Sequence, residues 1–126
     1  MVDDGDKMES SKYIADNALD AFERKDYDLV LKLAMPHATK GNSDAQTTVA
    51  LLYQCGFGVE RNVLEAERWL LKAAEQNNPV AWNNLGTLYA SKMPELQHRW
   101  SDAMKCYEKA KELGFNCAEP YPPPSY

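Results

Sequence analysis

The sequence predicts an all-α protein, an α-solenoid of three antiparallel helix pairs with a proline-rich C-terminal tail. Three observations predict it. Two apolar patterns with helical spacing alternate along the chain, the step between successive pairs is constant, and glycine, asparagine and proline residues stand where helices begin and end. The 126 residues allow one compact domain. We expect it at residues 11–118, between a flexible acidic N-terminus at 1–10 and the tail at 119–126.

The first helix of each pair carries its apolar residues at the spacing i, i+4, i+7, i+8. This spacing gathers them on one face of a helix. We expect these first helices around residues 12–24, 43–55 and 79–91. Their core positions are Ile14, Ala18, Ala21 and Phe22, then Ala45, Val49, Leu52 and Tyr53, then Ala81, Leu85, Leu88 and Tyr89.

The second helix of each pair follows a different spacing of i, i+3, i+4, i+7, which also marks one helical face. We expect second helices around residues 27–40, 63–76 and 100–113. Their core positions are Val30, Leu33, Ala34 and His37, then Ala66, Trp69, Leu70 and Ala73, then Ala103, Cys106, Tyr107 and Ala110. The pairs are therefore predicted at about 12–40, 43–76 and 79–113.

The residues between the pairs support this register. From the last core position of a second helix to the first core position of the next pair, the step is eight residues both times. Gly41 and Gly114 follow second helices, and Asn77 stands at the same register. Both residue types tolerate the left-handed conformation that closes a helix. Asn78 followed by Pro79 predicts the start of the next helix.

The turn inside each pair is longer in the second and third pairs. In the second it is residues 56–62, which begin Gly-Phe-Gly, whereas the third contains Pro94 and no glycine. Asn62, with Glu65 three residues later, resembles a capping box in which asparagine replaces serine or threonine. We therefore expect the second helix of this pair to begin after Asn62.

A set of motif residues recurs in the second and third pairs. It comprises Gly41 to Gln46, Leu52, Tyr53, Gly56 to Val59, Ala66, Trp69 and Lys72 to Glu75, and again Ala81, Leu85, Gly86, Leu88, Tyr89, Ala103, Tyr107, Lys109 and Ala110. These residues resemble the Sel1-like repeat family, longer-looped relatives of tetratricopeptide repeats. The resemblance covers roughly residues 26–118, and segment 12–40 is similar to a shorter, tetratricopeptide-like pair. It implies a non-catalytic α-solenoid that binds other proteins.

The sequence contains no recognisable catalytic or metal-binding motif. His37 and His98 are its only histidines, and His37 occupies a core position, so a structural histidine is expected. The glycine loop follows a helix and lacks the third glycine of a nucleotide-binding fingerprint. Cys55, Cys106 and Cys117 cannot all pair with one another, and we expect free thiols. We therefore expect no enzymatic activity, no cofactor and no metal site.

The net charge of −5 indicates the class of partner. Nucleic acids and anionic membranes attract clustered Lys and Arg, so neither is expected, and a basic protein fits better. The first ten residues are acidic where a secretory leader would be basic and then apolar. The apolar runs are too short to span a membrane. We expect a cytoplasmic protein that is a monomer or a weak homodimer.

The family resemblance implies that the first helices line a concave face with side chains one position away from the core. We expect this partner-binding groove to be acidic at its N-terminal end and neutral and hydrogen-bonding at its C-terminal end. The alternative is that the acidic residues merely solvate an outer helix. The predicted positions are Tyr13, Asp16, Asp20 and Glu23 in the first pair, Asp44, Thr47, Leu51 and Gln54 in the second, and Val80, Asn83, Thr87 and Ala90 in the third.

Three functions remain open at this point. An immunity or antitoxin-like protein would use the acidic groove to neutralise a basic bacterial toxin or effector, such as a nuclease. An adaptor or regulatory scaffold would dock a peptide, with Asn83 and its polar neighbours holding the extended backbone. A hydrolytic enzyme is kept as the third because such activity has been suspected in related repeat proteins. The tail is open too: a disordered end, a strap over the last pair, or a docked peptide.

Overall fold

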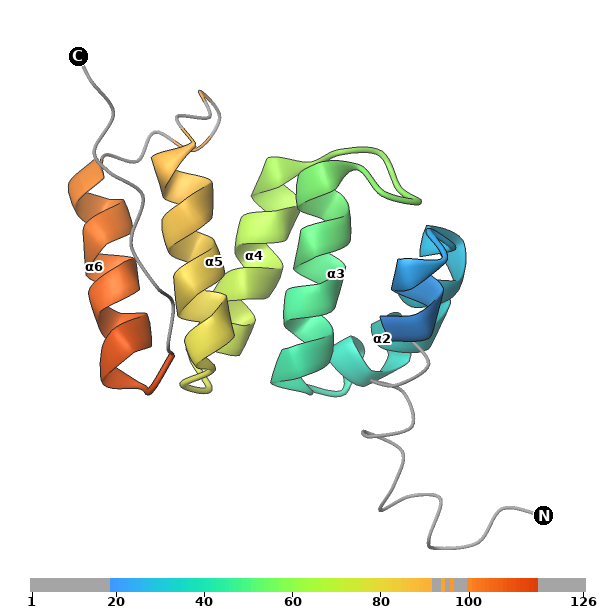
Figure 1. Ribbon diagram of the computed structural model, residues 1–126, viewed down its shortest axis with the longest axis horizontal. Helices are drawn as coiled ribbons and strands as arrows, with labels where there is room; N and C mark the ends of the chain where they lie inside the picture. Colours follow the sequence, from blue (N-terminus) through green and yellow to red (C-terminus); the bar gives the residue numbers. More distant parts are fainter. Residues whose placement is uncertain (1–18, 92–93, 95, 97–99, 116–126) are drawn as a thin grey trace, which may run out of the picture.

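The computed structural model describes residues 19–91, 94, 96 and 100–115. They form a helical turn at residues 19–23 and five helices placed one after another along the molecule (Figure 1). The described part contains no β-strand, and the predicted all-α solenoid is confirmed. The predicted N-terminal segment and proline-rich tail lie outside the described residues. The helices are α2 (Tyr27–Thr39), α3 (Ser43–Cys55), α4 (Val63–Ala74), α5 (Pro79–Ala90) and α6 (Trp100–Glu112).

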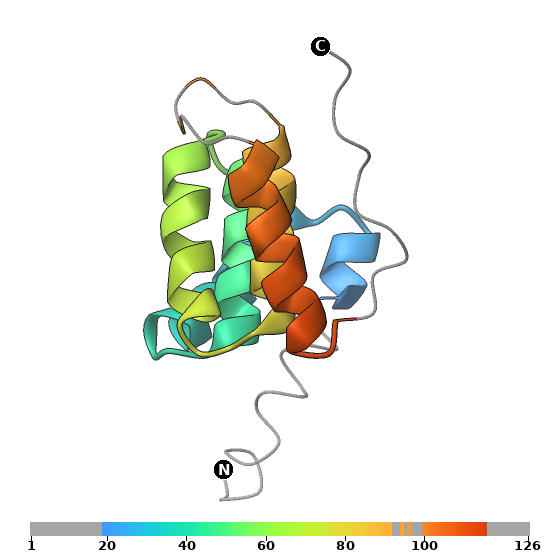
Figure 2. The same cartoon turned by 90° about the vertical axis from the view of Figure 1, so that its left-hand side faces the viewer.

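The helices of the second and third predicted pairs pack as hairpins. Within the second and third pairs, α3 packs along α4 and α5 packs along α6. Between pairs, α2 packs on α3, α4 packs on α5, and the first helices α3 and α5 touch each other directly. Figure 2 shows α4 and the turn at residues 19–23 on opposite sides of the molecule, with α3 and α5 between them. Of the predicted first helices, α3 and α5 therefore lie between α4 and the turn at residues 19–23.

Helices α2 to α5 all begin at an Asp or Asn whose side-chain oxygen accepts a backbone N–H three residues further on. The distances are 3.3 Å for Asp26, 2.9 Å for Asn42, 3.0 Å for Asn62 and 3.1 Å for Asn78. Such caps satisfy one of the backbone donors that a helix leaves free at its start. The sequence therefore marks the start of each of these helices by the same local device.

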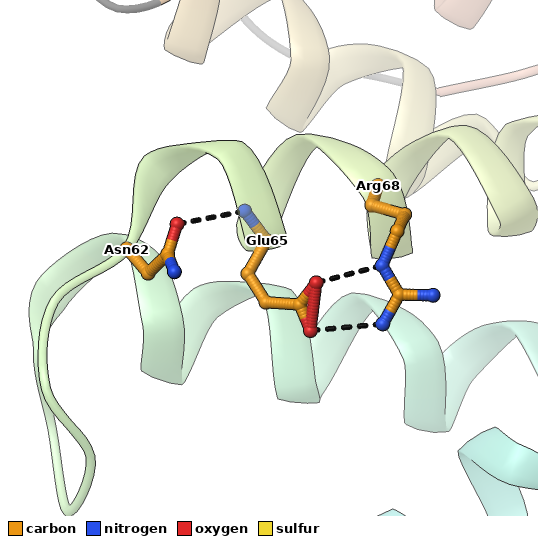
Figure 3. Close-up of polar contacts among 3 residues, drawn as sticks. All are labelled: Asn62, Glu65 and Arg68. Atoms are coloured by element: carbon orange, nitrogen blue, oxygen red, sulfur yellow. Dashed lines mark hydrogen bonds and ion pairs between the residues drawn. The ribbon is translucent and has the colours of Figure 1, made fainter.

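The capping box predicted at Asn62 forms only by half. The side-chain oxygen of Asn62 accepts the backbone N–H of Glu65, but the Glu65 carboxylate does not return the bond (Figure 3). It accepts two hydrogen bonds from the Arg68 guanidinium instead, at 2.7 and 2.8 Å. These bonds lower the pKa of the Glu65 carboxyl. The backbone N–H of Asn62 donates to the carbonyl of Tyr53 at 2.9 Å, so it needs no carboxylate.

Most of the core positions predicted from the spacing are buried. Phe22, Leu33, Tyr53 and Tyr107 are only half-buried, and Ile14 and Ala18 lie outside the described residues. Of the largest side chains, Leu52, Leu70, Leu85 and Leu88 are fully buried. The C-terminal half of α2 departs from the prediction. His37 is only half-buried, whereas its neighbour Ala38 is 1% exposed. Alanine allows the close approach of α3 there, while the histidine ring stays at the boundary with solvent.

Candidate partner-binding face

The first helices α3 and α5 share a stripe of side chains that face away from the core. These residues occupy equivalent places in the two repeats and are half-buried or exposed, while most of their neighbours are buried. Because α3 and α5 contact each other and the stripes occupy equivalent positions, we treat the two stripes as one candidate surface, which we call the open face. The open face consists of Asp44, Thr48, Leu51 and Cys55 on α3, and of Val80, Asn84 and Thr87 on α5 with Ser91 just after it. The spacing is the same in both sets.

Several predicted groove residues lie on the open face or at its edge. Asp44, Leu51, Val80 and Thr87 belong to it. Gln54, Asn83 and Ala90 are half-buried beside it. Asp20 and Glu23 are exposed on the turn at residues 19–23, and Tyr13 and Asp16 lie outside the described residues.

Of the groove positions predicted on α3 and α5, Thr47 alone is buried. Its side chain is only 8% exposed, and its hydroxyl donates to the carbonyl of Asp44 at 2.7 Å. The reason is that α3 has neighbours on three sides, α2, α4 and α5, which leaves a narrow free stripe. Thr48, one position further on, falls within that stripe and was missed, as was Asn84 on α5. The spacing i, i+4, i+7, i+11 gives Thr48 and Cys55 when it starts at Asp44, and Asn84 and Ser91 when it starts at Val80.

Asp44 also joins two repeats. The side-chain amide of Asn78 donates to the Asp44 carboxylate and to the Ser43 hydroxyl, both at 2.9 Å. The carbonyl oxygen of the same amide caps α5 by accepting the N–H of Ala81 at 3.1 Å. Asn78 is 7% exposed. Since an unpaired polar group buried this deeply is costly, these bonds fix the start of α5 against the start of α3.

A second link between repeats runs through Gln46. Its side-chain N–H donates to the carbonyl of Ala38 at 3.1 Å, and its carbonyl oxygen accepts from the Gln76 side chain at 3.1 Å. Gln46 is 4% exposed. This buried amide therefore ties α2, α3 and the end of α4 together below the open face.

Charge is unevenly distributed over this surface. On α3 and α5 the open face has only one charged member, Asp44. The N-terminal end differs, because its exposed acidic side chains outnumber the basic ones: Asp20, Glu23, Asp26 and Asp28 against Arg24 and Lys25. Arg24 pairs with Asp20 at 3.3 Å, but both are well exposed, so the pair contributes little. We call residues 20–28 the acidic end.

The last repeat differs from the middle one where α6 crosses α5. The ring of Tyr107 lies over Gly86, where an added Cβ would be 2.7 Å from its nearest ring carbon. In the middle repeat the equivalent residues are Leu70 and Ala50. The Tyr107 hydroxyl reaches the edge of the open face, 3.2 Å from the Thr87 hydroxyl. A missing side chain on one helix thus makes room for a larger one on the other.

The two described cysteines are free thiols, as predicted, and Cys117 lies outside the described residues. Burial raises the pKa of the Cys55 thiol, although Arg61 acts in the opposite direction. Burial, together with Asp102, raises the pKa of the Cys106 thiol to about 11. Both thiols are therefore protonated at neutral pH, which makes them weak nucleophiles.

The part of the chain that the structure describes contains no group of three or more His, Cys, Asp or Glu residues arranged to hold a metal ion. Over the same residues, none of the helices has the length and apolar character needed to cross a bilayer.

The geometry agrees with comparisons against known proteins. The Sel1 repeat family profile matches residues 43–78 and 101–115. A solved structure described as a Sel1 repeat protein from Oxalobacter formigenes is similar, with 33% sequence identity and a TM-score of 0.68. The match covers 79% of this chain and 39% of that protein, so this chain spans about two fifths of its length. A search of curated proteins gave no match.

Proposed function

Because the chain belongs to the Sel1-like repeat family, as its motifs predicted, we propose that it binds a partner protein through the open face and the acidic end. The fold itself supports a protein–protein interaction module, and Sel1 repeats are in general non-catalytic. Stacked helical hairpins present extended surfaces that suit this task.

One observation carries the proposal: the direct contact between α3 and α5. It supports treating their free stripes as one surface, and the buried amides of Gln46 and Asn78 hold neighbouring repeats in a fixed register. A surface fixed in this way binds without first being ordered, which lowers the entropic cost of association.

The most concrete role we propose is that of a cytoplasmic immunity or antitoxin-like protein. The acidic end suits a basic toxin or effector domain, since opposite charges speed the encounter and favour the correct partner. In this role the protein acts as a monomer or a weak homodimer and needs no nucleic acid, membrane, metal or cofactor.

The test begins with the partner. A tagged form of the chain is used to purify its partner from source cells, and the partner is identified by mass spectrometry. We expect a basic protein in a complex of fixed stoichiometry, whose toxicity to cells is relieved by co-expression of this chain. A partner that is not toxic would overturn the immunity role.

The surface is tested by charge reversal. The variant Asp20→Lys with Glu23→Lys should weaken the complex about tenfold or more. The matched control, Glu75→Lys with Glu108→Lys, changes the net charge equally at exposed positions just after α4 and on α6, and should leave affinity nearly unchanged. Equal losses in both variants would mean that net charge, and not the acidic end, drives binding.

A peptide-docking adaptor is the alternative function. It is favoured by the uncharged character of the open face beyond Asp44, where Thr48, Asn84 and Thr87 offer hydrogen bonds. If it is correct, Thr48→Arg with Asn84→Arg should abolish binding, while reversal of the acidic end should have little effect.

A further inference from the structure

The apolar interior is divided into two clusters. The main one runs from α2 to α6. The smaller one has the buried residues Ala21, Val30 and Leu52, with partly buried side chains packed around them. Of these three, only Leu52 belongs to the hairpin of α3 and α4. Most apolar side chains of residues 19–31 therefore pack in this smaller cluster, and Leu31 packs against both clusters.

Three aromatic rings close this contact, and each comes from a different element. Tyr27, at the start of α2, stacks on Phe57 of the loop after α3, with ring centroids 4.4 Å apart and planes 12° apart. Phe22 meets both rings edge-on, at 5.4 Å from Tyr27 and 6.3 Å from Phe57. We call these three residues the aromatic clamp. Figure 1 shows the loop extending from α3 and α4 toward the turn at residues 19–23.

The loop that carries Phe57 has backbone contacts of its own. Gly56 and Gly58 both have positive φ, +73° and +72°, which glycine adopts without strain. The N–H of Phe57 donates to the carbonyl of Leu52 at 3.0 Å. A Cβ at Gly58 would lie 3.0 Å from the backbone of Tyr27, so glycine also permits the close approach. We call this loop, residues 56–62, the platform, because these contacts fix its shape.

The segment opposite the platform has weaker support. Leu19 is 59% exposed, Asp20 is also exposed, and Ala21 is the first buried residue of the part that the structure describes. The turn into α2 places Lys25 at a φ of +62°, a conformation that a residue other than glycine adopts at some cost. Among the described residues, the side chains that hold residues 19–31 in place are the clamp, Ala21 and the first turns of α2, namely Leu29, Val30 and Leu31.

We propose that residues 19–31 open and close as one unit on the platform, and that Phe57 is the positioning residue that sets the acidic end beside α3. Opening uncovers Leu52, Phe57 and Val59, which pack against this unit when it is closed. Asp20 and Glu23 move with the unit. Only the consequence for binding rests on the proposed function, because opening is a property of the free protein.

The test is hydrogen exchange of the free, full-length chain followed by mass spectrometry. In the wild-type protein, amides of residues 19–31 should exchange together and faster than those of α4 and α5. Phe57→Ala should speed exchange in residues 19–31 by about tenfold or more and leave α5 and α6 within about twofold of the wild type. The control Phe115→Ala shortens a half-buried phenylalanine at the far end and should not affect residues 19–31.

Three results would overturn the inference. One is equal protection of residues 19–31 and α5 in the wild type. Another is a uniform increase over all helices in Phe57→Ala. The third concerns Phe57→Leu, which keeps an apolar side chain but removes the ring stacking. Its exchange rate in residues 19–31 should lie between the rates of the wild type and Phe57→Ala. Full wild-type protection in Phe57→Leu would refute the clamp. None of these measurements needs a partner, so they succeed or fail independently of the proposed function.

Discussion

The contact between Gly86 and Tyr107 predicts that the effect of Gly86→Ala on the free energy of unfolding changes sign with the residue at position 107. Alanine is favoured over glycine inside a helix by about 0.8–1.0 kcal/mol. At position 86, however, the new Cβ would meet two ring carbons of Tyr107 at 2.7 and 2.8 Å. Overpacking of this kind costs about 1–3 kcal/mol. Gly86→Ala should therefore destabilise the protein by about 1 kcal/mol, despite the better helix propensity.

The second substitution removes the ring. Tyr107→Leu introduces the residue that the middle repeat has at the equivalent position, where it packs beside Ala50. Alone, it should cost about 1–2 kcal/mol, because it leaves space over the glycine and removes the contact with the Thr87 hydroxyl. In the Tyr107→Leu background, Gly86→Ala should stabilise the protein by about 1 kcal/mol. The two changes should thus be coupled by about 2 kcal/mol, well above the error of additivity.

The assay is urea unfolding of the wild type, the two single variants and the double variant, followed by far-UV circular dichroism. The coupling energy comes from the four free energies of unfolding. If Gly86→Ala stabilises the protein equally in both backgrounds, the ring does not restrict position 86 and the reasoning fails. The reciprocal cycle in the middle repeat, with Ala50→Gly and Leu70→Tyr, should show coupling of the same sign.

Two further predictions concern single side chains. Asn62→Ala removes the cap of α4 and should lower the free energy of unfolding by about 1 kcal/mol. Arg68→Ala breaks the exposed pair with Glu65 and removes the guanidinium from over the Trp69 ring, where Lys72 also lies. It should lower the free energy of unfolding by about 0.5 kcal/mol, so a loss equal to that of Asn62→Ala in urea unfolding would contradict the larger contribution assigned to the cap. Because burial raises its pKa, the Cys55 thiol should react with iodoacetamide more slowly than a free thiol at neutral pH and speed up as pH rises. Cys106 should react only after unfolding, so fast labelling of both thiols in the native protein, measured by mass spectrometry, would contradict these environments.

The fold was predictable because its signals are local. Helical spacing of apolar residues places the cores, and Asn42, Asn62 and Asn78 mark helix starts within three residues of the bonds they make. Left-handed residues mark the ends, with a φ of +106° at Gly41 and +62° at Asn77. None of these signals requires knowledge of how the helices pack.

The open face and the clamp were harder to predict because they depend on distant neighbours. Whether Thr47 or Thr48 faces solvent is decided by the three helices around α3, and the spacing of one helix cannot reveal them. The contact of Phe57 with Tyr27 joins residues from different pairs. The Gly-x-Gly loop was correctly interpreted as a turn, but its glycines also serve a close approach to another helix, which the sequence of the loop alone does not show.

In the proposed complex, the two parts of the surface govern different rate constants. The acidic end is exposed and carries its charges near solvent, so it acts at a distance, through the rate of encounter, and salt screens it. The open face on α3 and α5 is nearly uncharged and held in register by buried amides, so it acts only in contact, through the rate of dissociation. A toxin inhibitor needs both a fast encounter and slow release. A peptide adaptor needs only the open face. The salt dependence of the association rate therefore distinguishes the two functions more directly than the affinity does.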